Sequence, residues 1–210
     1  MEKIILENVT KELDDIKVLN KINLELTGGK IYGIIGRNGS GKSMLLKTIC
    51  GFLPPTEGRV FINGEDIYQK NIFPDSIAAM IDKPNYLPDL SAYENLKLIA
   101  SINHTVSDDN IIDALNLVNL ENNKKVFKKF SLGMKQKLGI AQVIMENTKI
   151  MIFDEPFNGV EEETTEKLRK YFKQLKKDGK IILISSHIKE DIETLCDKVY
   201  KIQDGTIINE

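Results

Sequence analysis

Apolar and polar residues alternate near the N-terminal end of the chain. In Ile22–Leu26 every second residue is apolar, and Asp14-Asp15 marks a turn between two such segments. A period of two is typical of half-buried strands. Arg59–Ile62 is predicted as a further strand, because a strong turn signal, Asn63-Gly64, follows it. These segments predict an antiparallel β subdomain at the N-terminal end, and the pattern around Asp204-Gly205 predicts a hairpin at the other end.

Other segments are apolar at nearly every position, as expected of strands that are covered on both faces. Such runs occur at Ile31–Ile35, Ile150–Phe153 and Lys180–Ser185. A helix is predicted from about Glu161 to Lys177, since acidic residues open this segment and lysines close it, in the order that the helix dipole favours. The pattern predicts an α/β fold with a mainly parallel sheet.

Between about residues 84 and 147 the apolar positions follow helical spacing instead. Ser91 and Ser107 are candidate N-caps for the first two of the helices expected there. The helical segments are Tyr93–Ala100, Ile111–Val118 and Leu138–Met145. We predict a single domain over residues 1–210, with a helical subdomain inserted at about 84–147 between two halves of the α/β core.

Composition excludes several classes of function. The chain has 210 residues, 29 of them basic and 31 acidic, and this near balance argues against a nucleic-acid-binding tract or a polybasic membrane anchor. Cys50 and Cys196 lack metal-ligand spacing and are expected to be buried thiols in a reducing compartment. The N-terminal segment becomes charged too early for a signal peptide, and no apolar run approaches the roughly 20 residues of a membrane span. Any membrane component is therefore expected on another chain.

The richest chemistry lies in a glycine-rich loop, Gly36–Ser43, between a predicted buried strand and a predicted helix. Glycines let several backbone N–H groups point into one concavity, and the helix adds the positive end of its dipole. Lys42 can then reach the β- and γ-phosphates, and the Ser43 hydroxyl can ligate Mg²⁺. A chance glycine-rich turn would not explain the flanking strand and helix. We predict ATP binding by Gly36, Arg37, Asn38, Gly39, Ser40, Gly41, Lys42, Ser43 and Met44.

Polar residues end two of the predicted parallel strands. Asp154 follows the run Ile150–Phe153 and is placed to hold Mg²⁺, and the adjacent Glu155 is placed to polarise the water that attacks the γ-phosphate. Without the phosphate loop, this pair could be an ordinary polar strand end. His187 ends the next apolar strand at the same sheet edge, where it could contact the γ-phosphate. The predicted catalytic residues are Glu155, His187 and Lys42.

A third element allows two interpretations. In the segment Phe130–Lys137, Ser131 precedes a helix and Gly133 follows two residues later. The serine could simply cap the helix. It could equally present its hydroxyl, together with backbone N–H groups, to an anion. Spacing alone does not choose between these alternatives.

Taken together, these segments resemble the ABC-type ATPase family over essentially the whole chain. Gly36–Ser43 is similar to the Walker A motif, Ile150–Glu155 to Walker B, Ser131–Gln136 to the ABC signature, Pro156–Glu161 to the D-loop region, and His187 to the switch histidine. The signature carries Leu and Met where the family usually has Gly and Gln. This form of the signature most resembles the bacitracin/lantibiotic-export type of ATPase subunit.

The resemblance implies a P-loop NTPase core and a head-to-tail dimer of two ABC ATPase chains, either two copies of this chain or this chain and a paralogue. Two ATP molecules would be sandwiched between them, with Ser131 and Gly133 binding the γ-phosphate across the dimer. ATP-driven closure would move an integral-membrane permease on a separate chain. The protein would then be cytoplasmic and would sit on the inner face of the cell membrane through that permease.

Three positions depart from the family pattern. The aromatic residue that usually stacks on adenine falls near Leu13, so Leu13 and Val18 are expected to pack on the base without stacking. Asp82 stands where the family has a glutamine that links Mg²⁺ to the membrane partner, and it would keep a ligand oxygen but add negative charge. Glu161 replaces the usual D-loop aspartate and is longer by one methylene.

The leading hypothesis is an ATP-hydrolysing subunit of an exporter, with its permease docked near the segment Asp82–Leu90. A soluble ABC ATPase acting on ribosomes or DNA is a second hypothesis, but the chain lacks a second cassette and a long coiled-coil insertion, and we expect no nucleic-acid partner. A nucleotide-dependent switch without turnover is a third. The presence of Lys42, Glu155 and His187 gives that idea little support.

Overall fold

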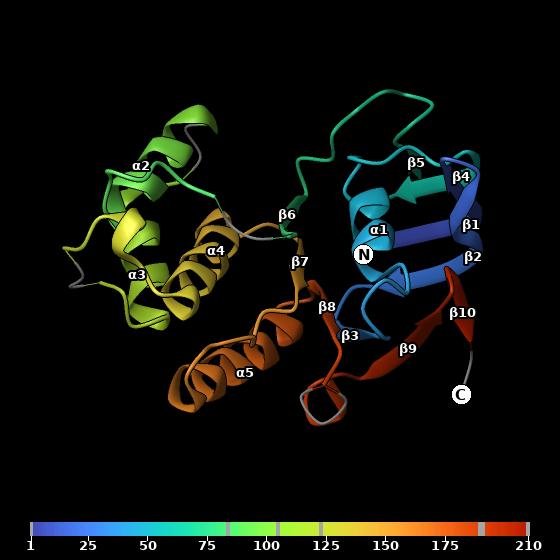
Figure 1. Ribbon diagram of the computed structural model, residues 1–210. Helices are drawn as coiled ribbons and strands as arrows, with labels where there is room; N and C mark the ends of the chain where they lie inside the picture. Colours follow the sequence, from blue (N-terminus) through green and yellow to red (C-terminus); the bar gives the residue numbers. More distant parts are fainter. Residues whose placement is uncertain (1, 83–84, 104–105, 122–123, 189–191, 209–210) are drawn as a thin grey trace.

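A four-stranded antiparallel sheet occupies one side of the computed structural model, which describes residues 2–82, 85–103, 106–121, 124–188 and 192–208 (Figure 1). Its strand order is β2-β1-β4-β5. The N-terminal β subdomain predicted from the alternating pattern is therefore confirmed. Its strands are β1 Lys3–Leu13, β2 Ile16–Thr27, β4 Glu57–Ile62 and β5 Glu65–Asp66.

A second sheet has six strands in the order β10-β9-β3-β8-β7-β6. All neighbouring strands are parallel except β9 and β10, which form the predicted hairpin. Strand β6 was not predicted, because two of its four residues are alanines, which are uncommon in strands. The strands are β3 Lys30–Ile35, β6 Ile77–Met80, β7 Ile150–Asp154, β8 Ile181–Ser186, β9 Lys198–Gln203 and β10 Thr206–Ile208.

The helices fall into two groups. Helices α2, α3 and α4 form a group beside the sheets, whereas α1 and α5 lie against the sheets themselves (Figure 1). The helical subdomain is thus present, although its predicted boundary at residue 84 lies outside the described residues. The helices are α1 Lys42–Ile49, α2 Ala92–Asn103, α3 Asp108–Leu117, α4 Leu132–Glu146 and α5 Glu162–Lys177, with a short 3₁₀ helix at Phe127–Lys129.

Local sequence explains where these helices begin. The predicted cap Ser107 accepts a hydrogen bond from the Asn110 N–H and forms a capping box with it. Ser91 accepts a hydrogen bond from the Glu94 N–H in the same way. Helix α4 begins at Leu132, directly after the candidate cap Ser131 and six residues before the apolar spacing recognised from Leu138, because Lys135, Gln136 and Lys137 interrupt the apolar pattern of its first turns.

Both faces of the six-stranded sheet are covered, which explains its continuous apolar strands. Met151 and Phe153 of β7 pack with the helices α4 and α5, and the Phe153 and Phe172 rings lie 4.9 Å apart. Ile150 and Ile152 point to the other face, where α1 and the four-stranded sheet pack. Only the carboxyl ends of the central strands therefore open onto polar surroundings.

Both cysteines are free thiols, as predicted: Cys50 is buried and Cys196 is half-buried. Burial raises the pKa of each thiol to about 12, so both stay protonated at neutral pH. They pack as small apolar side chains in the core.

Candidate nucleotide-binding site

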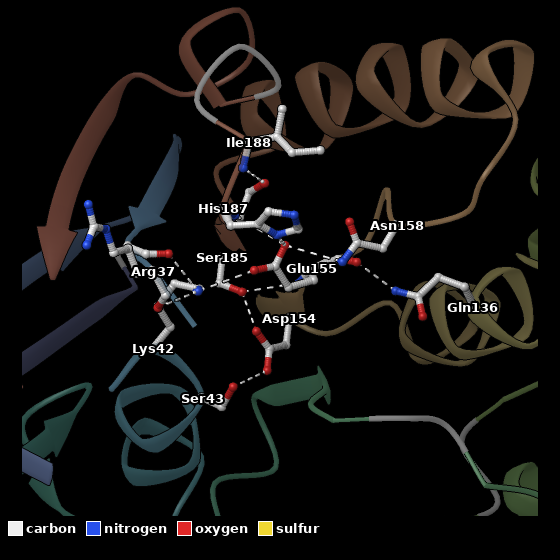
Figure 2. Close-up of polar contacts among 12 residues, drawn as sticks. Arg37, Lys42, Ser43, Gln136, Asp154, Glu155, Asn158, Ser185, His187 and Ile188 are labelled. Carbon is white, nitrogen blue, oxygen red and sulfur yellow. Dashed lines mark hydrogen bonds and ion pairs between the residues drawn. The ribbon is translucent and has the colours of Figure 1, made fainter. Parts of the chain in front are cut away.

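The carboxyl ends of three neighbouring parallel strands bring the predicted site residues together (Figure 2). In the β3–β8 pair, Ile35 lies opposite Ser186, and in the β7–β8 pair, Asp154 lies opposite Ser185. The glycine-rich loop follows β3 directly. Strand pairing alone thus aligns the loop, the acids and the polar end of β8 at one edge, which is where ligands bind in open α/β sheets.

The loop closes onto α1 without a side-chain cap. Gly41 is the N-cap of α1 and has a φ of +109°, a backbone conformation that favours glycine. A Cβ atom at this position would also lie 2.8 Å from the Val18 carbonyl oxygen. Arg37, Asn38 and Gly39 are exposed. The first N–H groups of α1 are therefore left without a side-chain acceptor, as an anion site at a helix start requires.

Lys42 is 6% exposed, and its ammonium group is surrounded by oxygen atoms. The Nζ atom donates to the carbonyl oxygens of Gly36 at 2.9 Å and Arg37 at 3.4 Å, and it lies 3.3 Å from Glu155 Oε1. These partners compensate the cost of burying the charge. A phosphate group in the loop would compete with Glu155 for this ammonium group.

Ser43 and Asp154 form the second pair at the sheet edge. Ser43 Oγ donates to Asp154 Oδ2 at 2.6 Å, and Ser185 Oγ donates to Asp154 Oδ1. A hydroxyl and a carboxylate are the ligand types that hold Mg²⁺ beside a nucleotide in phosphate-loop proteins. Within the described residues, no cluster of three or more His, Cys, Asp or Glu could hold a metal, so protein groups would supply only part of a coordination shell.

One further atom of the loop fits an anionic ligand. The Ser40 hydroxyl oxygen is buried and has no hydrogen-bond partner among the residues that the structure describes. A buried polar atom without a partner is costly in a finished core but useful where a ligand will supply the partner. This atom, the uncapped start of α1 and the Ser43–Asp154 pair together fit a magnesium–nucleotide complex.

Glu155 is held between two basic side chains. Its Oε2 atom lies 2.7 Å from His187 Nδ1, while Oε1 faces Lys42 (Figure 2). Its backbone has a φ of +51°, a strained value for a non-glycine residue, and its N–H donates to Ser185 O and Oγ, each at 3.1 Å. A carboxylate in this position can take a proton from a nearby water.

Ser131 and Gly133 lie at the start of α4. Ser131 Oγ accepts a hydrogen bond from the Met134 N–H at 3.2 Å, so the capping interpretation is confirmed. The serine is nevertheless exposed, and α4 lies on the far side of Glu155 from Lys42 (Figure 2). Anion binding by Ser131 and Gly133 in a second chain therefore remains a prediction.

The other predicted residues are more dispersed. Leu13 is 38% exposed at the tip of the β1–β2 hairpin, and Val18 is half-buried beside Gly41. Met44 packs against the core from the first turn of α1. Asp82 has a φ of +61°, and its Oδ2 atom forms an ion pair with Lys47 Nζ at 2.6 Å. In this structure the Asp82 carboxylate thus faces a lysine of α1.

A cavity of about 750 Å³ borders the loop. It lies between the glycine-rich loop, the His187 side chain and the β9–β10 hairpin. The contribution of this hairpin was not predicted, since nothing in its sequence marks it as a site. The lining residues are Ile35, Gly36, Arg37, Asn38, Gly39, Ser40, His187, Lys201, Ile202, Gln203 and Asp204.

Sequence reasoning also missed two polar residues that contact the paired acids Asp154 and Glu155. Ser185 contacts both Asp154 and the Glu155 backbone, and Gln136 Nε2 donates to the Glu155 carbonyl oxygen at 2.8 Å. The polar run Ser185–His187 at a strand end was a signal for the first. No local signal was available for Gln136, because its contact crosses from one subdomain to the other.

Comparison with known proteins agrees with this geometry. The family model described as ABC transporter matches residues 19–158. An uncharacterized ABC transporter ATP-binding protein of Bacillus subtilis, YybJ, is 41% identical over 95% of this chain and 92% of its own length. The bacitracin transport ATP-binding protein BcrA of Enterococcus faecalis is 38% identical, over 97% of this chain and 67% of its own length. The lantibiotic transport ATP-binding protein SrtF of Streptococcus pyogenes is 36% identical, over 98% and 89%.

Solved structures give the same result. The ATP-binding cassette MJ0796, in a dimeric post-hydrolysis state bound to ADP and Pi, superposes with a TM-score of 0.87 at 25% identity, over 98% of this chain and 97% of that one. The ATP-binding subunit of another ABC transporter has a TM-score of 0.87 at 27% identity, over 97% and 87%. With its phosphate loop, its paired acids and these relatives, the chain belongs to the ABC transporter family of ATP-binding proteins.

Proposed function

We propose that this chain is the ATP-hydrolysing subunit of an exporter and that it drives a permease carried on a separate chain. One observation carries the proposal: Glu155 is held between Lys42 and His187, next to the Ser43–Asp154 pair. A nucleotide-binding protein without turnover would not need a carboxylate held in this way. The names of the relatives, which include bacitracin and lantibiotic transport proteins, favour an exporter over a soluble ATPase or a switch.

The residues at the sheet edge have different roles in hydrolysis. The N–H groups of the loop and Lys42 bind the β- and γ-phosphates, which requires the Lys42–Glu155 pair to separate. Ser43 and Asp154 would hold Mg²⁺, which when bound supplies positive charge beside the phosphates. Glu155, released from Lys42, orients the attacking water and accepts its proton. His187 keeps its contact with Glu155 and faces the γ-phosphate position.

The active form is proposed to be a dimer of cassettes, with either a second copy of this chain or a paralogue. Helix α4, which begins with Ser131 and Gly133, carries Gln136 on the side of Glu155 away from Lys42 (Figure 2), and this placement supports a role for Ser131 and Gly133 at the site of another chain. In a head-to-tail pair they would bind the γ-phosphate of the partner's ATP. Leu13 and Val18 would pack on the adenine from the β1–β2 hairpin.

The permease is proposed to dock near the segment Asp82–Leu90, of which residues 83–84 lie outside the described part. This segment joins the core to the helical subdomain, and the Leu87 side chain is 51% exposed there. Among the described residues no helix is both long enough and apolar enough to cross a membrane. The proposed location is the inner face of the cell membrane, reached through the permease.

The test is the oligomeric mass of Glu155→Gln, measured by light scattering with and without MgATP, beside the ATPase rate of the wild type. The amide cannot accept a proton, so we expect turnover to fall by at least about 100-fold and a dimer to accumulate with MgATP. Glu163→Gln is the matched control, since Glu163 is an exposed acid of α5 that pairs with Lys167. A variant that binds ATP but stays monomeric contradicts self-pairing, and a wild type without turnover contradicts hydrolysis.

A further inference from the structure

The start of α4 contacts the loop 155–161 that follows β7 at three points. A Cβ atom at Gly133 would lie 2.2 Å from the Gly159 carbonyl oxygen, so only glycine permits this close approach. Gln136 Nε2 donates to the Glu155 carbonyl oxygen at 2.8 Å. Lys137 Nζ, on a side chain that is 7% exposed, lies 3.2 Å from Glu161 Oε2. The first turns of α4 and this loop therefore behave as one packed unit.

Only one of these contacts reaches the backbone of the catalytic acid itself. On its N-terminal side, Glu155 is fixed by Ser185, which accepts from the Glu155 N–H. On its C-terminal side, the Glu155 carbonyl oxygen accepts from Gln136 and from the Asn158 N–H, the latter at 3.3 Å. These bonds hold Glu155 at its positive φ, and of the two bonds to its carbonyl oxygen only the Gln136 bond comes from outside the loop. Without it, the strained conformation loses a constraint.

The Gln136 side chain suits a coupling role better than the neighbouring ion pair does. Glu161 is 66% exposed, and water screens its attraction to Lys137. The Gln136 amide is half-buried, and it bonds to the backbone carbonyl group of Glu155 itself. The bond also spans the junction between the helical subdomain and the core, because α4 belongs to the first and β7 to the second.

We propose that Gln136 is a positioning residue that couples the two ATP sites of the dimer. The inference rests on the proposed function, in which Ser131 and Gly133 of this helix engage the partner's nucleotide. When that nucleotide fixes the start of α4, Gln136 fixes the Glu155 backbone of its own chain. ATP bound at one site of the dimer thereby fixes the position of Glu155 at the other site. The coupling needs no movement of Lys42 or Ser43, so it affects turnover more than nucleotide affinity.

The test is steady-state ATP hydrolysis by Gln136→Met, a variant of similar length that cannot donate the bond. Its matched control is Gln142→Met on the same helix, where Gln142 Oε1 accepts from the Tyr86 hydroxyl at 2.7 Å, away from the catalytic loop. We expect kcat to fall by about tenfold in Gln136→Met, the Hill coefficient for ATP to fall towards one, and KM and ATP affinity to change by less than about twofold. Gln136→Asn, whose amide is too short to reach, serves as a second variant if the first does not fold.

The outcomes separate this inference from the function on which it rests. Equal losses in Gln136→Met and Gln142→Met overturn the inference, because they point to general weakening of α4. So does wild-type turnover with a Hill coefficient of one, although hydrolysis then stands. A wild type that neither hydrolyses ATP nor dimerises overturns the proposed function itself. Cooperative hydrolysis that is lost only in the Gln136 variants supports the coupling.

Discussion

Helices α1 and α4 both begin at glycine-containing sequences that are proposed to bind phosphate, but their N-termini are capped differently. The N-cap of α1 is Gly41, which makes no side-chain bond, and the buried Lys42 follows directly. The N-cap of α4 is Ser131, whose hydroxyl satisfies the Met134 N–H within its own chain. The start of α1 therefore leaves its first N–H groups without a side-chain acceptor, whereas at the start of α4 one of these groups is already bonded within the chain.

We infer from this difference that the start of α1 binds the ligand, whereas α4 transmits the effect of ligand binding to the loop 155–161. An uncapped helix start beside a buried lysine binds an anion by itself, because its N–H groups, its dipole and the ammonium group all point to one place. A capped and exposed start offers less to an anion. Helix α4 instead contacts the loop 155–161, so a ligand bound at the start of α4 can affect the position of that loop. Three experiments can break or sharpen this comparison.

The largest effect is expected for Lys42→Met at the start of α1. The substitution removes the charged donor beside the loop, so we expect ATP affinity to fall by about 100-fold and hydrolysis to be lost. Titration with a fluorescent ATP analogue measures the first, and phosphate release the second. Lys47→Met, one turn further along α1, is the matched control and should bind ATP as the wild type does. Tight binding by Lys42→Met would show that the start of α1 does not depend on its lysine.

An intermediate effect is expected for Ser131→Ala at the start of α4. Loss of an N-cap costs about 1 kcal/mol of the free energy of unfolding, and Ser107→Ala, which removes the similar cap of α3, should cost the same. Only Ser131→Ala should also weaken ATP-dependent dimerisation, by about tenfold, because only this hydroxyl is proposed to contact the partner's nucleotide. Urea denaturation and sedimentation measure the two quantities. Equal dimerisation by Ser131→Ala and Ser107→Ala would show that Ser131 acts only as a helix cap.

The smallest effect is expected where each helix is fixed by a lysine ion pair. Lys47 of α1 pairs with Asp82 after β6, and Lys137 of α4 pairs with Glu161 after β7. Lys137 is the more buried of the two lysines, so losing its partner is the more costly. We expect Glu161→Gln to lower the free energy of unfolding by less than about 1 kcal/mol and Asp82→Asn by less still, both measured by urea denaturation. A larger loss of stability in Asp82→Asn than in Glu161→Gln would show that the ion pair of α1 contributes more to stability than the ion pair of α4.

The same two helices show what the sequence can predict. The start of α1 was predicted in full, since its strand, loop and helix are contiguous and each carries its own local signal. At α4, helical spacing was recognised only from Leu138, and Ser131 as the cap of the helix was one of two interpretations, because Lys135, Gln136 and Lys137 interrupt the apolar pattern. Strand β6 was not predicted, because two of its four residues are alanines, which are uncommon in strands.

In the candidate site, too, residues with a local sequence signal were predicted and residues that act through tertiary contacts were not. Lys42, Ser43, Asp154, Glu155 and His187 were all predicted, because each ends a strand or opens a helix at one sheet edge. The partners of these residues were not predicted. Ser185 reaches Asp154 across a strand pair, and Gln136 reaches Glu155 across two subdomains. Such contacts depend on tertiary packing, which leaves no local pattern in the chain.

The pairing of Asp154 with Ser185 across β7 and β8 also has a consequence for the evolution of the chain. Alternate residues of β7 point to opposite faces, so an insertion of one residue within the strand would turn the acid into the apolar layer that holds Phe153. Such an insertion would remove catalysis and folding stability at once. We expect natural variation to exchange apolar side chains of similar volume in these strands but to preserve the strand lengths, and to confine gained or lost residues to the connections between them.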